Sequence, residues 1–205
     1  MARPTRLPSR RSVGNTRSGE ARADITEAAA NLLLEEGLDG FTIEGVARAA
    51  RSGKPTIYKW WGDKTQLAYE VYAQTVPVVT PDTDNAQSVR AKICAFHEEL
   101  WKLWDQPKLA EISRHLIADA QSDLISIAAY RDQYFAKRLA PLFKLVRDGI
   151  DNGDLPETID VDTVVDLLSG FHMLRLLLDR PVDRATIQRA LDIVLSGAAE
   201  LAKEN

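Results

Sequence analysis

Residues 41–67 read FTIEGVARAARSGKPTIYKWWGDKTQL, and this stretch decides the architecture of the N-terminal region. Thr42 is a favourable N-cap, and the apolar residues behind it recur at helical spacing: Ile43, Val46, Ala47 and Ala50. Pro55 fits only near a helix start, because it has no N–H to donate. The pattern therefore predicts two short helices, over 42–50 and from 53 or 54 to about 60, joined by a tight turn as in a helix-turn-helix.

The second of these helices carries the residues expected to meet DNA. In a helix-turn-helix it projects into a major groove about 12 Å wide, while the first helix crosses the backbone. At about 100° per residue, Ile57 and Trp61 share the inner face, which leaves the lysines outward. The first turns of neighbouring helices can also bind phosphates. The predicted DNA-binding residues are Thr42, Lys54, Pro55, Thr56, Tyr58, Lys59, Trp60 and Lys64. The alternative is an ordinary helical corner, with both tryptophans in the core and the lysines solvated.

The same stretch resembles the DNA-binding motif of the tetracycline-repressor (TetR) family. The matching positions are Thr42-Ile43, Val46-Ala47, Ala50, Thr56-Ile57-Tyr58, Trp60-Trp61, Lys64 and Leu67. The family's usual Ala-Gly-Val-Ser turn reads Ala50-Arg51-Ser52-Gly53 here, so we expect an altered or strained turn where arginine stands in place of glycine. The resemblance implies a DNA-binding regulator, usually a repressor, that binds a palindromic operator as a homodimer and is released by a small-molecule effector.

Charge is distributed unevenly along the chain. The 205 residues carry a formal net charge of -4, which by itself argues against a nucleic-acid partner. Residues 1–70, however, hold 11 Lys and Arg against 9 Asp and Glu, and residues 1–17 contain five arginines and no acid. A polyanion is therefore expected to meet the N-terminal end. We interpret residues 1–17 as a disordered basic arm that either reaches the minor groove or has no partner.

The rest of the chain predicts helices only. Ser18 is expected to cap the first helix and Gly37 to end it. No segment alternates as a strand does, and a helical stretch over 123–151 is expected to kink at Pro141. The sequence thus predicts an all-α protein of about nine helices. Its expected parts are the arm over 1–17, a three-helix helix-turn-helix DNA-binding domain over 18–76, and a helical ligand-binding and dimerisation domain over 83–205.

The resemblance extends more loosely to residues 146–156 and to the two helices expected after them. In the TetR family, the last two long helices pair with those of a second subunit. Apolar stripes on these predicted helices suit such an isologous interface. The predicted interface residues are Leu167, Phe171, Leu174, Leu178, Ile187, Leu191, Val194 and Leu195. The alternative is that both helices pack only within one subunit.

Members of the family usually bind an effector among the middle helices, and aromatic walls with a few polar groups suit small-molecule binding. The predicted pocket residues are Phe96, Trp101, Trp104, His115, Tyr130, Tyr134, Phe171 and His172, with His97 and Phe135 as further candidates. Aromatic residues at helical spacing also form ordinary core. No cofactor is expected, and no metal either, because no histidine–cysteine cluster has metal-ligand spacing.

Other classes of protein find little support. The sequence has no phosphate-binding glycine loop and no Ser/His/Asp set, so nothing in it favours an enzyme. Cys94 is the only cysteine, which favours a reducing cytoplasm and a buried packing role for this residue. No segment is apolar enough for a membrane helix or a signal peptide. A helical protein-interaction module without DNA binding, and a DNA-binding regulator without an effector, remain as alternatives.

Overall fold

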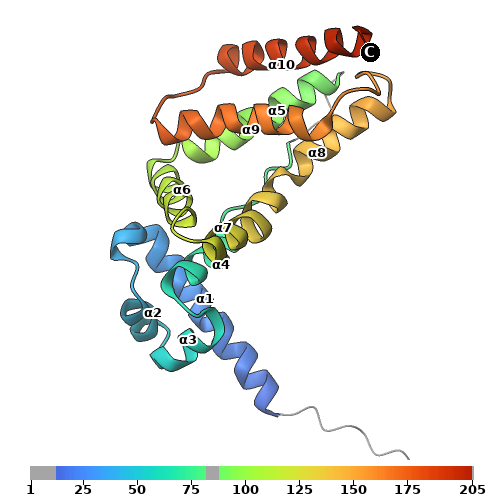
Figure 1. The fold of residues 1–205 in the computed structure, drawn as a ribbon. Helices are drawn as coiled ribbons and strands as arrows, with labels where there is room; N and C mark the ends of the chain where they lie inside the picture. Colours follow the sequence, from blue (N-terminus) through green and yellow to red (C-terminus); the bar gives the residue numbers. More distant parts are fainter. Residues whose placement is uncertain (1–12, 82–87, 205) are drawn as a thin grey trace, which may run out of the picture. The chain divides into compact units, whose positions relative to one another are not determined.

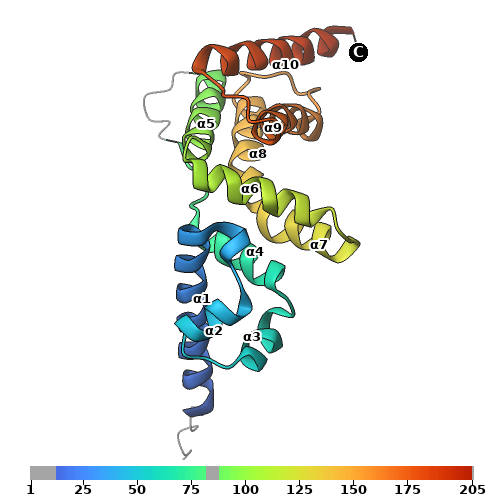
Figure 2. The ribbon, with the colours of Figure 1, turned by 90° about the vertical axis from the view of Figure 1, so that its left-hand side faces the viewer.

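A computed structural model describes residues 13–81 and 88–204 (Figure 1, Figure 2). These residues form ten α-helices and one π-helical segment and contain no strand, which confirms the all-α prediction. The chain divides into two compact units between Val71 and Tyr72, inside helix α4.

The N-terminal unit is built from the first helices of the chain. Their bounds are α1 Val13–Gly40, α2 Ile43–Ala49, α3 Lys54–Trp61 and α4 Lys64–Thr75. Helix α2 packs on α1 and α3 packs on α2. The side chains between them are almost fully buried and come from every one of these helices, as the helical spacing requires: Ile25, Ala29, Leu33, Val46, Ile57 and Leu67.

Helix α1 begins earlier than predicted. It starts at Val13, five residues before Ser18, so Ser18 is not its N-cap and residues 13–17 are not part of an arm. A serine and a single glycine, here Gly14, each cost only about 1 kcal/mol or less inside a helix, so neither stops it. The C-terminal end of α1 agrees with the prediction that Gly37 ends the first helix, because Gly37 interrupts the helical backbone with a φ of 71°. Residues 1–12 of the predicted arm lie outside the described residues.

The C-terminal unit is a bundle of longer helices. Their bounds are α5 Val89–Trp104, α6 Pro107–Ala120, α7 Leu124–Ala129, η1 Tyr130–Phe135, α8 Ala136–Asp151, α9 Val161–Leu177 and α10 Arg184–Glu204. Helix α9 contacts α6, α8 and α10, and α5 contacts α8 and α10 (Figure 2). Several helices start at the polar caps that the sequence suggests. The Ser88 hydroxyl, for example, accepts the Ala91 N–H at 3.2 Å, and the Asp160 carboxylate accepts the Thr163 N–H at 3.3 Å.

The long helical stretch predicted over 123–151 is interrupted before Pro141. Pro141 lies inside helix α8, and the irregular backbone is the π-helical segment η1, which joins α7 to α8. One long predicted helix therefore becomes two, and this accounts for the tenth helix. Proline removes one N–H, which neighbouring turns tolerate, whereas a π segment leaves no reliable signature in the sequence.

Two further observations concern the core and the surface. Cys94 is buried, as predicted, and burial together with the nearby Glu98 carboxylate raises the pKa of its thiol to about 11. In the described part of the chain, no helix is both long and apolar enough to cross a membrane.

Candidate nucleic-acid interface and effector cavity

Helices α2 and α3 form the predicted helix-turn-helix. The Thr42 hydroxyl accepts the Gly45 N–H at 3.0 Å and so caps α2. The turn closes when the Ser52 N–H donates to the Ala47 carbonyl at 2.9 Å, a bond that requires a left-handed residue between them. That residue is Arg51, with a φ of 50°. The altered turn expected from the missing glycine is therefore a strained one, at a cost of about 1 kcal/mol.

The inner face of α3 is anchored by two residues of the predicted pair. Ile57 and Trp61 are 0% and 3% exposed. The indole N–H of Trp61 donates to the Glu70 carboxylate at 2.8 Å. Arg22 donates to both oxygens of the same carboxylate at 2.9 Å, and its guanidinium lies over the Trp61 ring at 5.2 Å. Side chains from α1 and α4 thus hold the end of α3 and fix which of its faces points outward.

The outward face of α3 presents several of the predicted DNA-binding residues together. Pro55, Tyr58 and Lys59 are exposed, and Tyr58 keeps 48% of its surface open. Thr56 and Trp60 are half-buried at the flanks, where the Trp60 ring packs edge-on against Trp61 at 5.6 Å. This arrangement leaves one ammonium, one phenol and two flanking polar groups available to a partner that approaches α3.

Two predicted DNA-binding lysines already have partners within the unit. The Lys54 ammonium forms an ion pair with Glu44 of α2 at 2.7 Å, and the Glu44 carboxylate has a lowered pKa because of this hydrogen bond. The Lys64 ammonium donates to the Leu38 carbonyl at 3.3 Å. Both lysines would have to share or exchange these partners to bind a phosphate.

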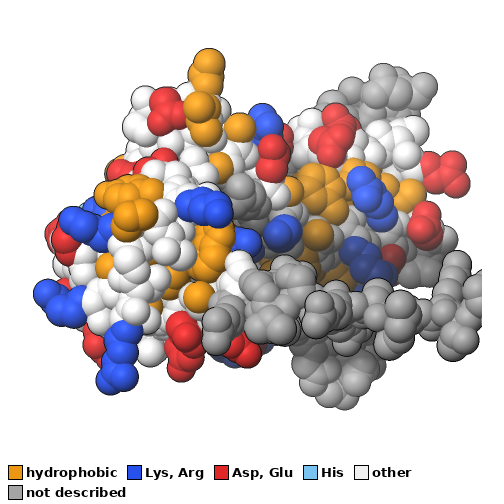
Figure 3. Space-filling view, turned by 90° about the horizontal axis from the view of Figure 1, so that it is seen from below, with side chains coloured by type: hydrophobic (Ala, Val, Ile, Leu, Met, Phe, Trp, Pro, Cys, Tyr) orange, Lys and Arg blue, Asp and Glu red, His pale blue; other side chains and the backbone are white. Residues whose placement is uncertain are grey.

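Figure 3 turns the view of Figure 1 so that the molecule is seen from below, and basic and acidic side chains are interspersed among the described residues drawn there. Arg48, Arg51 and Lys59 are exposed on and beside the helix-turn-helix, against the exposed acids Glu44 and Asp63. The local balance is therefore modestly positive, in agreement with the charge distribution of the sequence.

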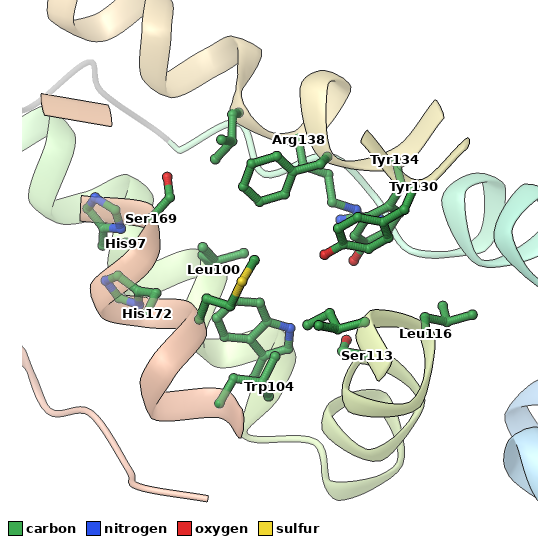
Figure 4. A pocket seen from close by; sticks show the side chains of 15 residues that line it. His97, Leu100, Trp104, Ser113, Leu116, Tyr130, Tyr134, Arg138, Ser169 and His172 are labelled. Atoms are coloured by element: carbon green, nitrogen blue, oxygen red, sulfur yellow. The ribbon is translucent and has the colours of Figure 1, made fainter. Parts of the chain in front are cut away.

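A cavity of about 50 Å³ lies within the C-terminal unit, between α5, α6, η1, α8 and α9 (Figure 4). It has two polar regions, and the side chains of Leu100 and Trp104 lie between them (Figure 4). His97, Ser169 and His172 lie together in one region, and Tyr130, Tyr134 and Arg138 lie together in the other (Figure 4).

The structure gathers part of the predicted pocket and leaves the rest elsewhere. Of the predicted residues, Trp104, Tyr130, Tyr134 and His172 line the cavity, as do the further candidates His97 and Phe135. Phe96 and Trp101 are buried in the core of the unit, and Phe171 and His115 are half-buried and do not line the cavity. Sequence reasoning missed Arg138 and Ser169. Arg138 follows Tyr130 and Tyr134 at the same four-residue spacing, which was the available signal.

The histidine region of the cavity is uncharged. The rings of His97 and His172 stack at 4.3 Å with an angle of 7° between their planes. Burial lowers the pKa of His97 well below its usual value, and burial with the nearby Arg175 charge lowers the pKa of His172 to about 4. Both nitrogens of His97, Nδ1 of His172 and Oγ of Ser169 are buried and have no hydrogen-bond partner among the described residues.

Helix α9 carries an apolar face that the described residues do not cover. Leu167, Leu174 and Leu178 are 55%, 54% and 56% exposed, and their spacing places them on one side of the helix. Phe171 and Val194 are half-buried beside this face. The other predicted interface residues, Ile187, Leu191 and Leu195, face the core of the same unit.

Comparison with known proteins identifies the class of protein that this geometry defines. Residues 25–71 match the bacterial regulatory proteins of the tetR family, and residues 80–194 match the tetracyclin repressor-like C-terminal domain. A regulator of Bacillus subtilis (strain 168), the uncharacterized HTH-type transcriptional regulator YdeS, is 30% identical over 80% of this chain and 82% of its own length. The chain belongs to the TetR family of helix-turn-helix, DNA-binding transcription regulators.

Two solved structures resemble this chain in fold. The TetR family transcription regulator SCO0332 is 34% identical, covers 87% of this chain and 98% of its own, and superposes with a TM-score of 0.73. The transcriptional regulator FadR from Bacillus subtilis, solved in complex with stearoyl-CoA, is 18% identical, covers 86% of this chain and 98% of its own, and has a TM-score of 0.63. The second likeness is one of fold alone.

Proposed function

We propose that this regulator binds a palindromic operator as a homodimer, represses transcription there, and is released when a small molecule enters the cavity of its C-terminal unit. The observation that carries the proposal is the outward face of α3, where Tyr58 and Lys59 stand exposed while Trp61 anchors the opposite face. A helix held in this way can insert its exposed residues into a major groove.

For the DNA contacts, we propose that Pro55, Lys59 and the freed Lys54 face the base edges. Thr42, Thr56, Tyr58, Trp60 and Lys64 would then contact phosphates on either side. Phosphate contacts position the protein, and base contacts select the sequence. The ion pair of Lys54 with Glu44 fits this division, because it holds the ammonium close to the start of α3 until a stronger acceptor arrives.

The apolar face of α9 supports the proposal that the protein forms a homodimer. An exposed stripe formed by Leu167, Leu174 and Leu178 is costly in water, and an isologous contact would bury it against the same stripe of a partner. Gly170 of the same helix has open space where a Cβ would stand, so a second helix could approach closely. Two-fold symmetry would then present two α3 helices to successive major grooves, about 34 Å apart.

For release, the cavity and its link to α4 support the proposal. Arg138 donates to the carbonyls of Val76 and Pro77, which directly follow α4 in the chain. The N-terminal part of α4 belongs to the DNA-binding unit, so a molecule that moves Arg138 would also change how the end of this helix is held. FadR, which is similar in fold, was solved in complex with stearoyl-CoA, and this gives a precedent in this fold for a bound small molecule. Only a ligand that binds one state more tightly than the other can shift the equilibrium.

The proposal is tested by selecting bound DNA from a random pool at a fixed salt concentration, with the full-length protein. A palindromic sequence with half-sites about one helical turn apart is expected. Failure to enrich any sequence, with no salt-dependent DNA binding, would instead favour a helical protein-interaction module. Enrichment of a palindrome that no small molecule releases would leave a regulator without an effector.

A further inference from the structure

We propose that the cavity takes a compact organic acid, with an apolar body of one ring or a short chain and a single carboxylate that binds Arg138. This inference rests on the proposed role of the cavity as an effector site and names the chemical class of the effector. The charge of the cavity, its polar atoms without partners and its volume support this assignment.

The charge comes from Arg138, whose side chain is only 9% exposed. Its Nη1 and Nη2 atoms donate to the carbonyls of Pro77 and Val76 at 3.0 and 2.6 Å, and its guanidinium lies 4.4 Å from the centre of the Tyr134 ring. These groups are neutral. No carboxylate in the described segments lies within ion-pair distance of Arg138, and its Nε is buried without a partner. A buried cation that lacks a counter-charge is unfavourable, so the site favours an anion.

A carboxylate is the anion that fits this arrangement. Guanidinium groups bind carboxylates by charge-assisted hydrogen bonds. Arg138 still has the N–H of Nε, which has no partner, and the second hydrogen of each Nη to donate. No aspartate or glutamate is among the 15 residues that line the cavity, so the described walls provide nothing to balance a ligand amine. The sign of the charge therefore excludes cationic ligands and favours acids over neutral analogues.

The histidine region would bind a second polar group of the ligand, or a water molecule beside it. His97 and His172 are neutral, so each ring offers one N–H and one lone pair, and Ser169 offers a hydroxyl (Figure 4). Buried polar atoms are normally satisfied, and here several are not. A hydroxyl or carbonyl on the far end of the ligand would satisfy them without adding charge.

The volume of the cavity limits the size of the ligand. About 50 Å³ is enough for a few water molecules and well below the roughly 300 Å³ of a usual ligand pocket, so the walls must move apart to admit a ligand. Trp104 and Leu176 line both this cavity and a neighbouring open pocket, so rotation of Trp104 would join the two. Three arginines and two aspartates line that pocket, and Arg114 is paired with Asp179, so the opening carries a small positive balance that favours an acid.

The test compares matched ligands on the unmodified full-length protein by isothermal titration calorimetry. The probes are 3-phenylpropionate and hexanoate, the amide of each, and the corresponding primary amines. The acids are expected to bind at least about tenfold more tightly than their amides, and the amines are expected not to bind. Equal binding of acid and amide, binding of an amine more tightly than the matching acid, or no binding of either acid at millimolar concentration would overturn the proposal.

Substitutions at Arg138 test whether the carboxylate of the ligand binds this residue. Arg138→Gln should remove the preference for acid over amide, whereas Arg147→Gln, an exposed arginine of the same helix, should leave it unchanged. Retention of the full preference in folded Arg138→Gln protein would contradict the assignment. If Arg138→Gln does not fold, Arg138→Lys keeps the charge but loses Nε, and the acids should bind it more weakly than they bind the unmodified protein.

Operator release separates the two proposals. If the acids bind but do not weaken operator binding, the ligand class stands and the effector role fails. If a neutral or cationic compound releases the operator while the acids do not bind, the effector role stands and the ligand class fails.

Discussion

The ammonium of Lys54 lies 2.7 Å from a carboxylate oxygen of Glu44, and this ion pair joins the first turn of α3 to the first turn of α2. Both side chains are more than half exposed, so the pair adds little to stability. Its position matters more than its strength, because a phosphate or a base approaching Lys54 must compete with the carboxylate.

Glu44→Gln is therefore expected to tighten DNA binding several-fold at low salt, because it removes a negative charge and frees an ammonium. The gain should shrink as salt rises, since the interaction lies at the surface. Fluorescence anisotropy with labelled operator at several salt concentrations measures it. Glu157→Gln, which removes an exposed charge of the C-terminal unit, is the matched control. Weaker binding of Glu44→Gln than of Glu157→Gln would show that the ion pair orients Lys54 and does not inhibit it.

Lys59→Ala is expected to weaken operator binding about tenfold or more, because this exposed ammonium stands on the outward face of α3. Competition against unrelated DNA shows whether Lys59 contacts a base or a phosphate. A base contact would be lost for the operator alone, and a phosphate contact would be lost for all sequences. Lys137→Ala, an exposed lysine of α8, should bind normally. Unchanged binding by Lys59→Ala would remove α3 from the interface as assigned.

Trp61→Ala is expected to destabilise the protein by about 3–5 kcal/mol, since it empties a buried aromatic site. Trp61→Phe keeps most of the ring but loses the hydrogen bond to Glu70, at a cost of about 1.5–3 kcal/mol. Urea unfolding monitored by circular dichroism gives both values. The contact would be of little energetic importance if the two variants unfolded at the urea concentration of the unmodified protein.

Stability should fall as the pH is lowered from 7 to 5. Because burial lowers the pKa of His172 from 6.5 to about 4, the unfolded chain gains a proton over this range that the folded chain excludes. At about 1.4 kcal/mol for each pH unit below the unfolded pKa, this amounts to about 2 kcal/mol at pH 5 and about 3 kcal/mol when the pH reaches the folded pKa. His97 contributes in the same direction. Thermal melts at intervals across the range should give a shallower slope for His172→Gln, and an unchanged slope would mean that the imidazole is not buried in solution.

If the proposed dimer forms through the apolar face of α9, Leu174→Glu is expected to give monomers and to abolish cooperative binding to a two-half-site operator, because it places a charge in that face. Sedimentation velocity measures the mass, and a single half-site serves as the reference DNA. Leu124→Glu, at a leucine of α7 that is 86% exposed, should remain dimeric. A dimeric Leu174→Glu protein would place the interface elsewhere.

The sequence predicted the parts of this structure that depend on local patterns. Helical spacing and caps located α2 and α3, and phase alone put Ile57 and Trp61 inside. The helical phase of a residue indicates which face of its helix the side chain occupies, but not which residue it contacts. The sequence therefore did not predict the ion pair of Lys54 with Glu44 or the hydrogen bond of Lys64 to the Leu38 carbonyl. Both depend on distances between helices that only the folded unit defines.

The cavity shows the same limit more clearly. Aromatic residues at helical spacing led to the correct prediction that Tyr130, Tyr134 and His172 line a pocket. The same pattern also occurs in ordinary core, however, and Phe96 and Trp101 belong to the core. Arg138 was missed because an arginine on a helix is normally solvated. It is buried against the carbonyls of Val76 and Pro77, 62 and 61 residues earlier in the chain, and such a long-range contact has no local signal in the sequence.

The positive φ of Arg51 has a consequence for how the corner between α2 and α3 is specified. Glycine would adopt this backbone on its own, whereas arginine does so only because the surrounding helices impose it. The corner is thus a property of the whole unit and not of its own residues. A synthetic peptide that covers α2 and α3 would sample other shapes, and transplanting the motif into a foreign scaffold would preserve its angle only with glycine at this position.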